Sequence, residues 1–239
     1  MHIYEAKIKR IEERYGSIFC FYLERPDALS WDIGTNIQVG LPAFNQNPEV
    51  LDQGLIRRLS VMTLEDEGEI GFCTRIREPL SPFKRQLKEM QLGDSLYLFE
   101  PISRVRAIDD CSSLVLLSQG VGITSYRSLI LDYLRSKNPH RPKELHLINV
   151  ERENQILFTE IFQVEDKCYS AETVPSREAY FKLLKERTDL LSQSEIYIIG
   201  SDEFLHQSIA ALRAIGISDE KMHLDKKPEK AEGFFKTCS

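Results

Sequence analysis

The sequence predicts a two-domain protein of the β plus α/β class. A six-stranded antiparallel β-barrel over residues 1–107 is followed by a doubly wound parallel-sheet α/β domain over residues 108–239. Two observations predict this order. Up to about residue 105, short strand-like segments recur between turn signals, and beyond residue 110 buried strands alternate with amphipathic helices. The length of 239 residues is sufficient for two small domains.

Each predicted strand of the first half alternates apolar and polar residues, or is rich in β-branched and aromatic residues, and turn signals such as Arg25-Pro26-Asp27 separate the strands. The six segments are residues 4–12, 17–23, 36–41, 56–64, 69–75 and 94–99. Between the last two, Ser81 is a suitable N-cap for a helix that reaches Met90. Six short strands at this spacing are typical of a small barrel.

The pattern changes after residues 109 and 110. Residues 113–118 form a continuous apolar run, as expected for a strand buried on both faces of a parallel sheet. Further strands are expected at 144–150 and 195–199, and helices at 126–135, 157–162, 177–191 and 204–215. Alternation of strands with helices favours a doubly wound sheet. The lysine-rich residues 226–230 are expected to be loosely ordered.

Charge and hydropathy exclude several functional classes. The formal net charge of -6 argues against nucleic-acid binding by bulk electrostatics. No apolar run approaches the about 18 residues that a membrane-spanning helix needs. The N-terminus also lacks the apolar core of a signal peptide. We therefore expect a cytoplasmic protein.

The cysteines and histidines do not form a recognisable metal site. The cysteines are scattered and none lies at a C-x-x-C spacing, which argues against a zinc ribbon or a cysteine-bound iron–sulfur cluster. They are Cys20, Cys73, Cys111, Cys168 and Cys238. In a cytoplasmic protein each is expected to be a reduced thiol. No histidine has a neighbour at metal-ligand spacing, so no metal is predicted.

A glycine-rich turn, residues 120–124, joins the first buried strand of the second half to a helix. Backbone amides at such a turn, together with the helix dipole, favour a phosphate. The alternative is a tight strand–helix turn that binds nothing. Gly200 follows another buried strand, and the carboxyl ends of parallel strands share one edge of the sheet, where open α/β sheets bind ligands. Two glycine-bearing strand ends at that edge favour an anion site.

The order of these segments resembles the ferredoxin–NADP reductase family of flavoenzymes over nearly the whole chain. The family's barrel motif, Arg-x-Tyr-Ser, is similar to Arg57-Arg58-Leu59-Ser60. The resemblance implies that Arg57 contacts the flavin phosphate and that Leu59 packs on the isoalloxazine ring. It also implies that the Ser60 hydroxyl lies near flavin N5, as the catalytic group. Leu59 departs from the motif, and its alternative role is that of a core residue of the strand.

Other segments are similar to the parts of the family that complete its two binding sites. The glycine turn resembles the loop that holds the diphosphate of the nicotinamide nucleotide, with Ser125 in place of a proline. The further flavin-binding residues implied in this way are Thr74, Arg75, Ile76, Ser81, Pro82 and Phe83. Ser81 is equally well explained as the cap of an ordinary helix. The nucleotide-binding residues implied are Gly120, Val121, Gly122, Ile123, Thr124, Arg152 and Gly200.

The resemblance implies a flavin-binding domain over residues 1–107 and an NAD(P)-binding domain over residues 108–239. It implies an NAD(P)H-dependent flavin oxidoreductase that holds FAD or FMN and oxidises NADH or NADPH. Without a fused iron–sulfur module, the electron acceptor would be separate: a ferredoxin, a flavodoxin, a haem protein or a small molecule. The alternative is a non-catalytic or electron-transfer subunit of the same fold. Leu59, and Ile199 where many relatives have cysteine, keep that alternative open.

Overall fold

The computed structural model describes residues 2–45, 51–103, 108, 111–135, 139–151 and 155–236. The chain divides into two compact units, Met1–Val105 and Arg106–Ser239. Each unit has its own β-sheet and its own hydrophobic core. The predicted fold class is therefore confirmed.

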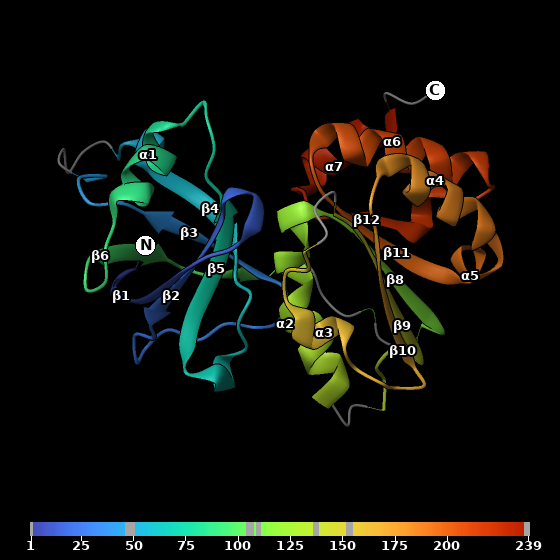
Figure 1. The fold of residues 1–239 in the computed structure, drawn as a ribbon, viewed down its shortest axis with the longest axis horizontal. Coiled ribbons are helices and arrows are strands. Elements are labelled where there is room, and N and C mark those ends of the chain that lie inside the picture. Colours follow the sequence, from blue (N-terminus) through green and yellow to red (C-terminus); the bar gives the residue numbers. More distant parts are fainter. Residues whose placement is uncertain are drawn as a thin grey trace. The chain divides into compact units, whose positions relative to one another are not determined.

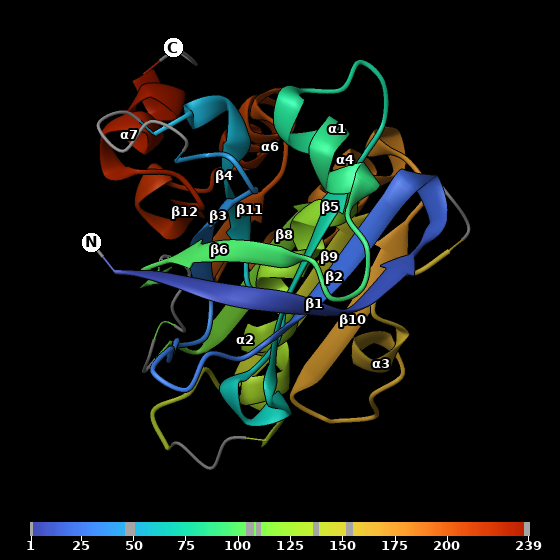
Figure 2. The same ribbon diagram turned by 90° about the vertical axis from the view of Figure 1, so that its left-hand side faces the viewer.

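Six strands of the first unit form a nearly closed antiparallel barrel (Figure 2). Within the described residues the strand order is β4-β3-β6-β1-β2-β5, and a short strand β7 pairs with β3. The backbone amide of Met62 donates to the Gly71 carbonyl at 2.8 Å, which joins the two ends of this order. The strands are β1 (Ile3–Glu13), β2 (Ile18–Glu24), β3 (Thr35–Gly40), β4 (Ile56–Ser60), β5 (Glu69–Arg75), β6 (Ser95–Phe99) and β7 (Ile102–Ser103).

The strand expected at 56–64 ends at Ser60, because the chain changes its partner there. The Val61 amide still donates to the Thr35 carbonyl at 2.8 Å, whereas the Met62 amide donates to β5 instead. The apolar pattern continues through this change, and so the sequence alone does not reveal where the strand ends.

Helix α1 (Pro82–Glu89) covers one end of the barrel (Figure 2). The Ser81 hydroxyl accepts a hydrogen bond from the Lys84 amide at 3.3 Å, which confirms Ser81 as the N-cap. Phe83 and Leu87, one turn apart, are buried in the barrel core. This apolar stripe orients the helix. The first turn of α1 therefore lies beside the arginines of strands β4 and β5.

The barrel contains a disulfide between Cys20 and Cys73, which corrects the expectation that all five cysteines are reduced thiols. The two residues lie directly opposite each other in the antiparallel pair of β2 and β5, and both are buried. A spacing of 53 residues gives no sign of this pairing, because strand register alone brings the two sulfurs together. Cys111 and Cys168 remain thiols.

The second unit is a parallel five-stranded sheet in the part of the chain that the structure describes, with the order β10-β9-β8-β11-β12. Helices α4, α5, α6 and α7 share a core on one face, and α2 and α3 lie on the other (Figure 1). The strands are β8 (Ser113–Gln119), β9 (Glu144–Val150), β10 (Tyr169–Val174), β11 (Ser194–Ile199) and β12 (Met222–Leu224). The helices are α2 (Thr124–Arg135), α3 (Thr159–Phe162), α4 (Arg177–Glu186), α5 (Thr188–Ser192), α6 (Asp202–Ala214) and α7 (Pro228–Lys236).

Three of these elements are absent from the sequence prediction. Strand β10 lies at the edge of the sheet, and β12 has three residues, so neither shows the long apolar run of a central strand. Helix α7 begins at Pro228, within the segment expected to be loosely ordered, and its aromatic residues pack on the core of the unit. Within the described ranges, no helix is long and apolar enough to cross a membrane.

Candidate functional site

The first candidate site lies where β4 and β5 approach the start of α1. Arg57, on β4, donates from Nη1 to the carbonyls of Gln53 and Ile56, at 3.1 and 2.8 Å. Its guanidinium carbon lies 5.9 Å from the centre of the Phe83 ring on α1. The β4 motif and the helix start, which the sequence predicts to serve one ligand, are therefore neighbours in the fold.

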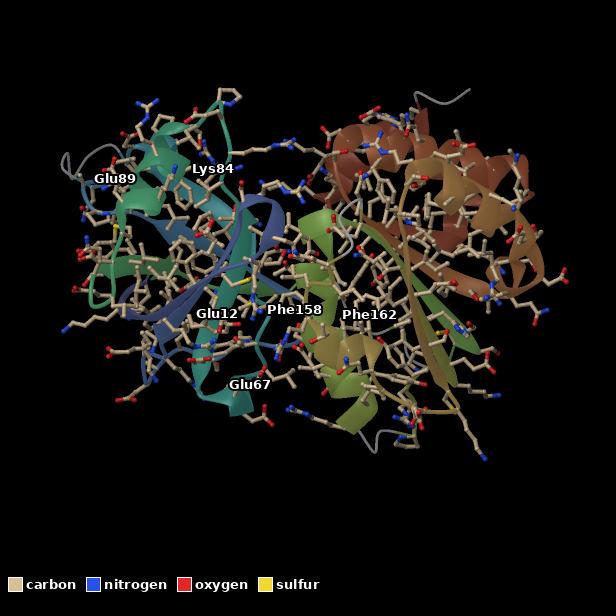
Figure 3. The ribbon with its side chains drawn as sticks, in the orientation of Figure 1. Glu12, Glu67, Lys84, Glu89, Phe158 and Phe162 are labelled. Carbon is tan, nitrogen blue, oxygen red and sulfur yellow. A yellow bond between two sulfur atoms is a disulfide. The ribbon has the colours of Figure 1, made fainter. Side chains whose placement is uncertain are left out.

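Four cationic side chains gather at this place. Burial, and then the positive charges of Arg77, Arg57 and Arg75, lower the pKa of Lys84 from its ordinary value. Lys84 lies in the first turn of α1, at the opposite end from Glu89 (Figure 3). Among the described residues, none of the four cations forms an ion pair with a carboxylate.

The same region contains an unpartnered polar atom. Arg75 Nε is buried and has no hydrogen-bond partner in the described part of the chain. Backbone amides of the first turn of α1 add to the positive potential, since a helix N-terminus favours an anion. The residues present therefore fit a phosphate or diphosphate group. Arg77 and Lys84 were missed by the sequence prediction, although each lies within three residues of a predicted member of the site.

The remaining residues that are predicted to bind flavin differ in how much of each side chain is exposed. Leu59 is half-buried and packs against the barrel core, as its alternative role as a core residue predicts. The Ser60 hydroxyl donates to Asn36 Oδ1 at 3.1 Å. Ile76 joins Phe83 in the core, and Thr74 is buried on β5. Pro82 is exposed at the start of α1.

The second candidate site is the carboxyl edge of the parallel sheet. A short 3-10 helix, Gly120–Ile123, follows β8 and leads into α2. On one side of β8 the sheet continues with β9 and then β10. On its other side lies β11, which pairs with β12. The ends of β8 and β11 therefore form the point at which the strand order reverses, where sheets of this type bind ligands.

Internal packing accounts for two of the glycines at this edge. A Cβ atom on Gly122 would lie 3.1 Å from the carbonyl oxygen of Ile199, and one on Gly200 would lie 2.4 Å from the Phe204 ring. Gly120 has a φ angle of 55°, a conformation that favours glycine. The fold needs these glycines whether or not a ligand binds.

Thr124 is the residue at this edge that packing leaves unexplained. Its side chain is 2% exposed, and Oγ1 has no hydrogen-bond partner among the described residues. Two residues later, the Tyr126 hydroxyl donates to the Leu117 carbonyl of β8 at 3.2 Å, and burial raises the pKa of Tyr126 well above its ordinary value. That bond fixes the first turn of α2 on the strand and holds the Thr124 hydroxyl in place.

Arg177 is a further residue of this edge that the sequence prediction missed. From the start of α4 it donates to Gln119 at the end of β8, at 3.0 Å, and forms an ion pair with Glu203 at 2.9 Å. Its Nε is buried and has no hydrogen-bond partner within the part of the chain that the structure describes, and it lines a pocket of about 580 Å³ beside α4. Arg152, also predicted to bind the nucleotide, lies outside the described residues. Val121 and Ile123 belong to the 3-10 helix, and Ile123 is fully buried.

The sequence matches no protein-family model and no curated protein. Its fold, however, is similar to several solved structures, among them ferredoxin–NADP+ reductases. The CS-b5R domains of human Ncb5or in the NAD+ form share 19% sequence identity with it at a TM-score of 0.74, over 94% of this chain and 70% of that one. A ferredoxin NADP+ reductase from Neisseria gonorrhoeae with bound FAD and NADP shares 16% identity at a TM-score of 0.72, over 93% and 98% of the two chains.

A third structure is the ferredoxin-NADP+ reductase from Plasmodium falciparum with 2'P-AMP, which shares 15% identity at a TM-score of 0.72, over 92% of this chain and 94% of that one. All three similarities extend over both units. At these sequence identities, the similarities establish the fold alone. The resemblance indicated by the motifs is therefore confirmed at the level of architecture: this chain has the two-unit fold of the ferredoxin–NADP reductases.

Proposed function

We propose that this chain is an NAD(P)H-dependent flavin oxidoreductase, with a flavin-binding domain over residues 1–107 and a domain that binds the nicotinamide nucleotide over residues 108–239. The observation that carries the proposal is the group of four cations at the start of α1. Concentrated positive charge is costly for a folded protein, and these four cations have no carboxylate partner among the described residues. A bound phosphate group would remove that cost, and a flavin nucleotide supplies one.

Arg57, Arg75 and Lys84, with the amides that follow Ser81, would hold the phosphate end of FAD or FMN. A guanidinium matches phosphate in charge and in geometry. Leu59 would cover part of one ring face with its half-exposed side chain. Ser60, already oriented by Asn36, would bring its hydroxyl to the reacting edge of the ring. Thr74, Ile76, Pro82 and Phe83 would shape the rest of the site.

The carboxyl edge of the second sheet would hold NADH or NADPH. Gly120, Val121, Gly122 and Ile123 would present backbone amides to the diphosphate, and the Thr124 hydroxyl would gain the partner it lacks. Gly200 would allow close approach at the end of β11, and Arg152 and Arg177 would contribute positive charge. A bound flavin would supply the redox chemistry, namely hydride acceptance from the nicotinamide and electron delivery to an acceptor. The protein contributes position and electrostatics.

The acceptor we propose is a separate molecule, namely a ferredoxin, a flavodoxin, a haem protein or a small molecule. Structures similar in fold include a ferredoxin reductase in carbazole 1,9a-dioxygenase. The second candidate function is an electron-transfer or non-catalytic subunit. It is favoured by Leu59, which packs on the barrel core and offers no aromatic ring for stacking.

Titration of FAD and FMN into the flavin-free protein tests the proposal. We expect Arg57→Ala to weaken flavin binding roughly ten- to hundredfold, because a charge-assisted hydrogen bond contributes about 1.5–3 kcal/mol. Arg85→Ala is the matched control, since Arg85 is an exposed residue of the same helix that does not act on Lys84. Equal flavin affinity in the Arg57 variant and in the control would show that the flavin site is misplaced.

A further inference from the structure

A polar pocket of about 210 Å³ lies in the first unit, where β3 begins and β6 has ended. None of the residues predicted to bind flavin lines it. Five of its lining side chains carry oxygen: Ser30, Asp32, Thr35, Glu65 and Ser103. They come from three segments that are far apart in the sequence, and the barrel brings them together.

Thr35 points to a ligand most directly. Its side chain is 2% exposed, and Oγ1 has no hydrogen-bond partner among the described residues. Thr35 pairs with Ser103 across β3 and β7, so the two side chains lie next to each other on one face of the sheet. Burial of a hydroxyl without a partner opposes folding, and a molecule in the pocket that bonds to Oγ1 would remove this penalty.

The pocket presents hydrogen-bond acceptors and few donors. Ser103 already donates its hydroxyl proton to the Ile33 carbonyl at 3.1 Å, so its oxygen is left to act as an acceptor toward any other group. Glu65 is paired with Arg25 and also accepts from the Trp31 amide at 3.3 Å. Asp32 is exposed and forms no hydrogen bond or ion pair with the described residues. Arg25 offsets the charge of Glu65, and Asp32 has no cationic partner among the described residues, so the described lining of the pocket retains one negative charge.

We propose that this pocket binds a small primary alkylammonium ion. Such an ion carries one positive charge and three N–H donors, which match the charge of Asp32 and the acceptor oxygens of Thr35 and Ser103. A metal ion fits less well, because the described residues contain no group of three or more His, Cys, Asp and Glu side chains that could hold one. The volume is below the roughly 300–1,000 Å³ of pockets for larger ligands, so the alkyl chain is short.

Titration of n-butylammonium chloride into the full chain, followed by the backbone amide NMR signals at constant ionic strength, tests this. We expect saturable shifts at Thr35 and Ser103, and none with 1-butanol, which has the same chain without the charge. Asp32→Asn should weaken binding at least about tenfold, because it removes the ion-pair partner. Thr35→Val, which keeps the shape of the side chain, should weaken it about two- to tenfold.

Asp27→Asn is the matched control, since Asp27 is an exposed carboxylate near the same segment that does not line the pocket. Its affinity should equal that of the unchanged protein. Two results would overturn the proposal: no saturable shifts with the unchanged protein at millimolar n-butylammonium, which would mean that water fills the pocket, or equal affinity in the Asp32 and Asp27 variants. Neither result depends on whether flavin binds.

Discussion

Among the described side chains of the first helix, Lys84 is the one whose pKa responds most clearly to the surrounding positive charge. Its pKa is lowered by burial first and then by three arginines. The folded chain therefore binds this proton less tightly than the unfolded chain does. Lys84 consequently opposes folding wherever it is protonated, until an anion binds beside it. Such a cost to folding is what we expect of a residue that would bind an anionic ligand.

This placement predicts a specific pH dependence for the flavin-free protein. The penalty from Lys84 is complete below its lowered pKa and disappears as the pH rises toward 10.5, the value in the unfolded chain. Lys84→Met should therefore raise the free energy of unfolding at neutral pH and flatten its rise with pH. Urea denaturation between neutral and alkaline pH measures both effects.

Lys88→Met is the control for that measurement, because Lys88 is exposed in the last turn of the same helix. We expect no gain in stability from it. Equal stability of the Lys84 and Lys88 variants would mean that the cations do not repel one another enough to require an anion. The group of cations would then no longer support a flavin site.

At the carboxyl edge of the parallel sheet, packing between elements explains some of the residues, and a ligand would explain another. Gly122 and Gly200 are required by the close approach of Ile199 and of Phe204. The tight-turn alternative is therefore sufficient for these two glycines. The buried Thr124 hydroxyl is different, because no contact within the described fold uses it.

Thr124→Val distinguishes the two explanations. Valine keeps the shape of threonine and removes the hydroxyl, so the flavin-free and nucleotide-free protein should be at least as stable as the original. If the hydroxyl binds the nucleotide, the KM for NADH or NADPH should rise roughly two- to tenfold, as expected for the loss of one hydrogen bond.

Ser113→Ala provides the comparison, since the buried Ser113 hydroxyl, at the start of β8, also has no hydrogen-bond partner among the residues that the structure describes. It should leave the KM unchanged. A Thr124 variant whose KM equals that of the Ser113 variant would remove Thr124 from the nucleotide site.

The elements also show how far the sequence predicts the structure. Local signals were sufficient for the barrel strands, α1 and the central strands of the second sheet, because each has a long alternating or apolar run or a clear cap. They were insufficient for edge strand β10 and for three-residue β12, which bury too little to leave such a run. Three residues of the candidate sites were missed for another reason: Arg177 meets Gln119 across 58 residues, and Arg77 and Lys84 join Arg57 only after the barrel folds.

At the scale of the whole molecule, the disulfide conflicts with the expected compartment. Thiols are kept reduced in the cytoplasm, whereas Cys20 and Cys73 are bonded in the fold. The cytoplasmic location therefore stays a prediction, and the oxidation state of this pair bears on it directly.

Thiol titration of the protein, purified and unfolded without reductant, checks the pair. We expect three of the five cysteines to react, because the bonded pair is blocked, and all five to react after reduction. If all five react without reductant, the pair is reduced in solution, and the original expectation of five thiols is restored.

Hydride transfer from NADH or NADPH to a bound flavin is the activity that we propose for this chain. It is tested most directly by the visible absorption of the protein loaded with FAD or FMN, recorded anaerobically before and after addition of NADH and of NADPH. We predict that the absorption of the oxidised flavin is lost with at least one of the two nucleotides. A protein that takes up neither flavin, or a bound flavin that stays oxidised with both nucleotides, would contradict the account.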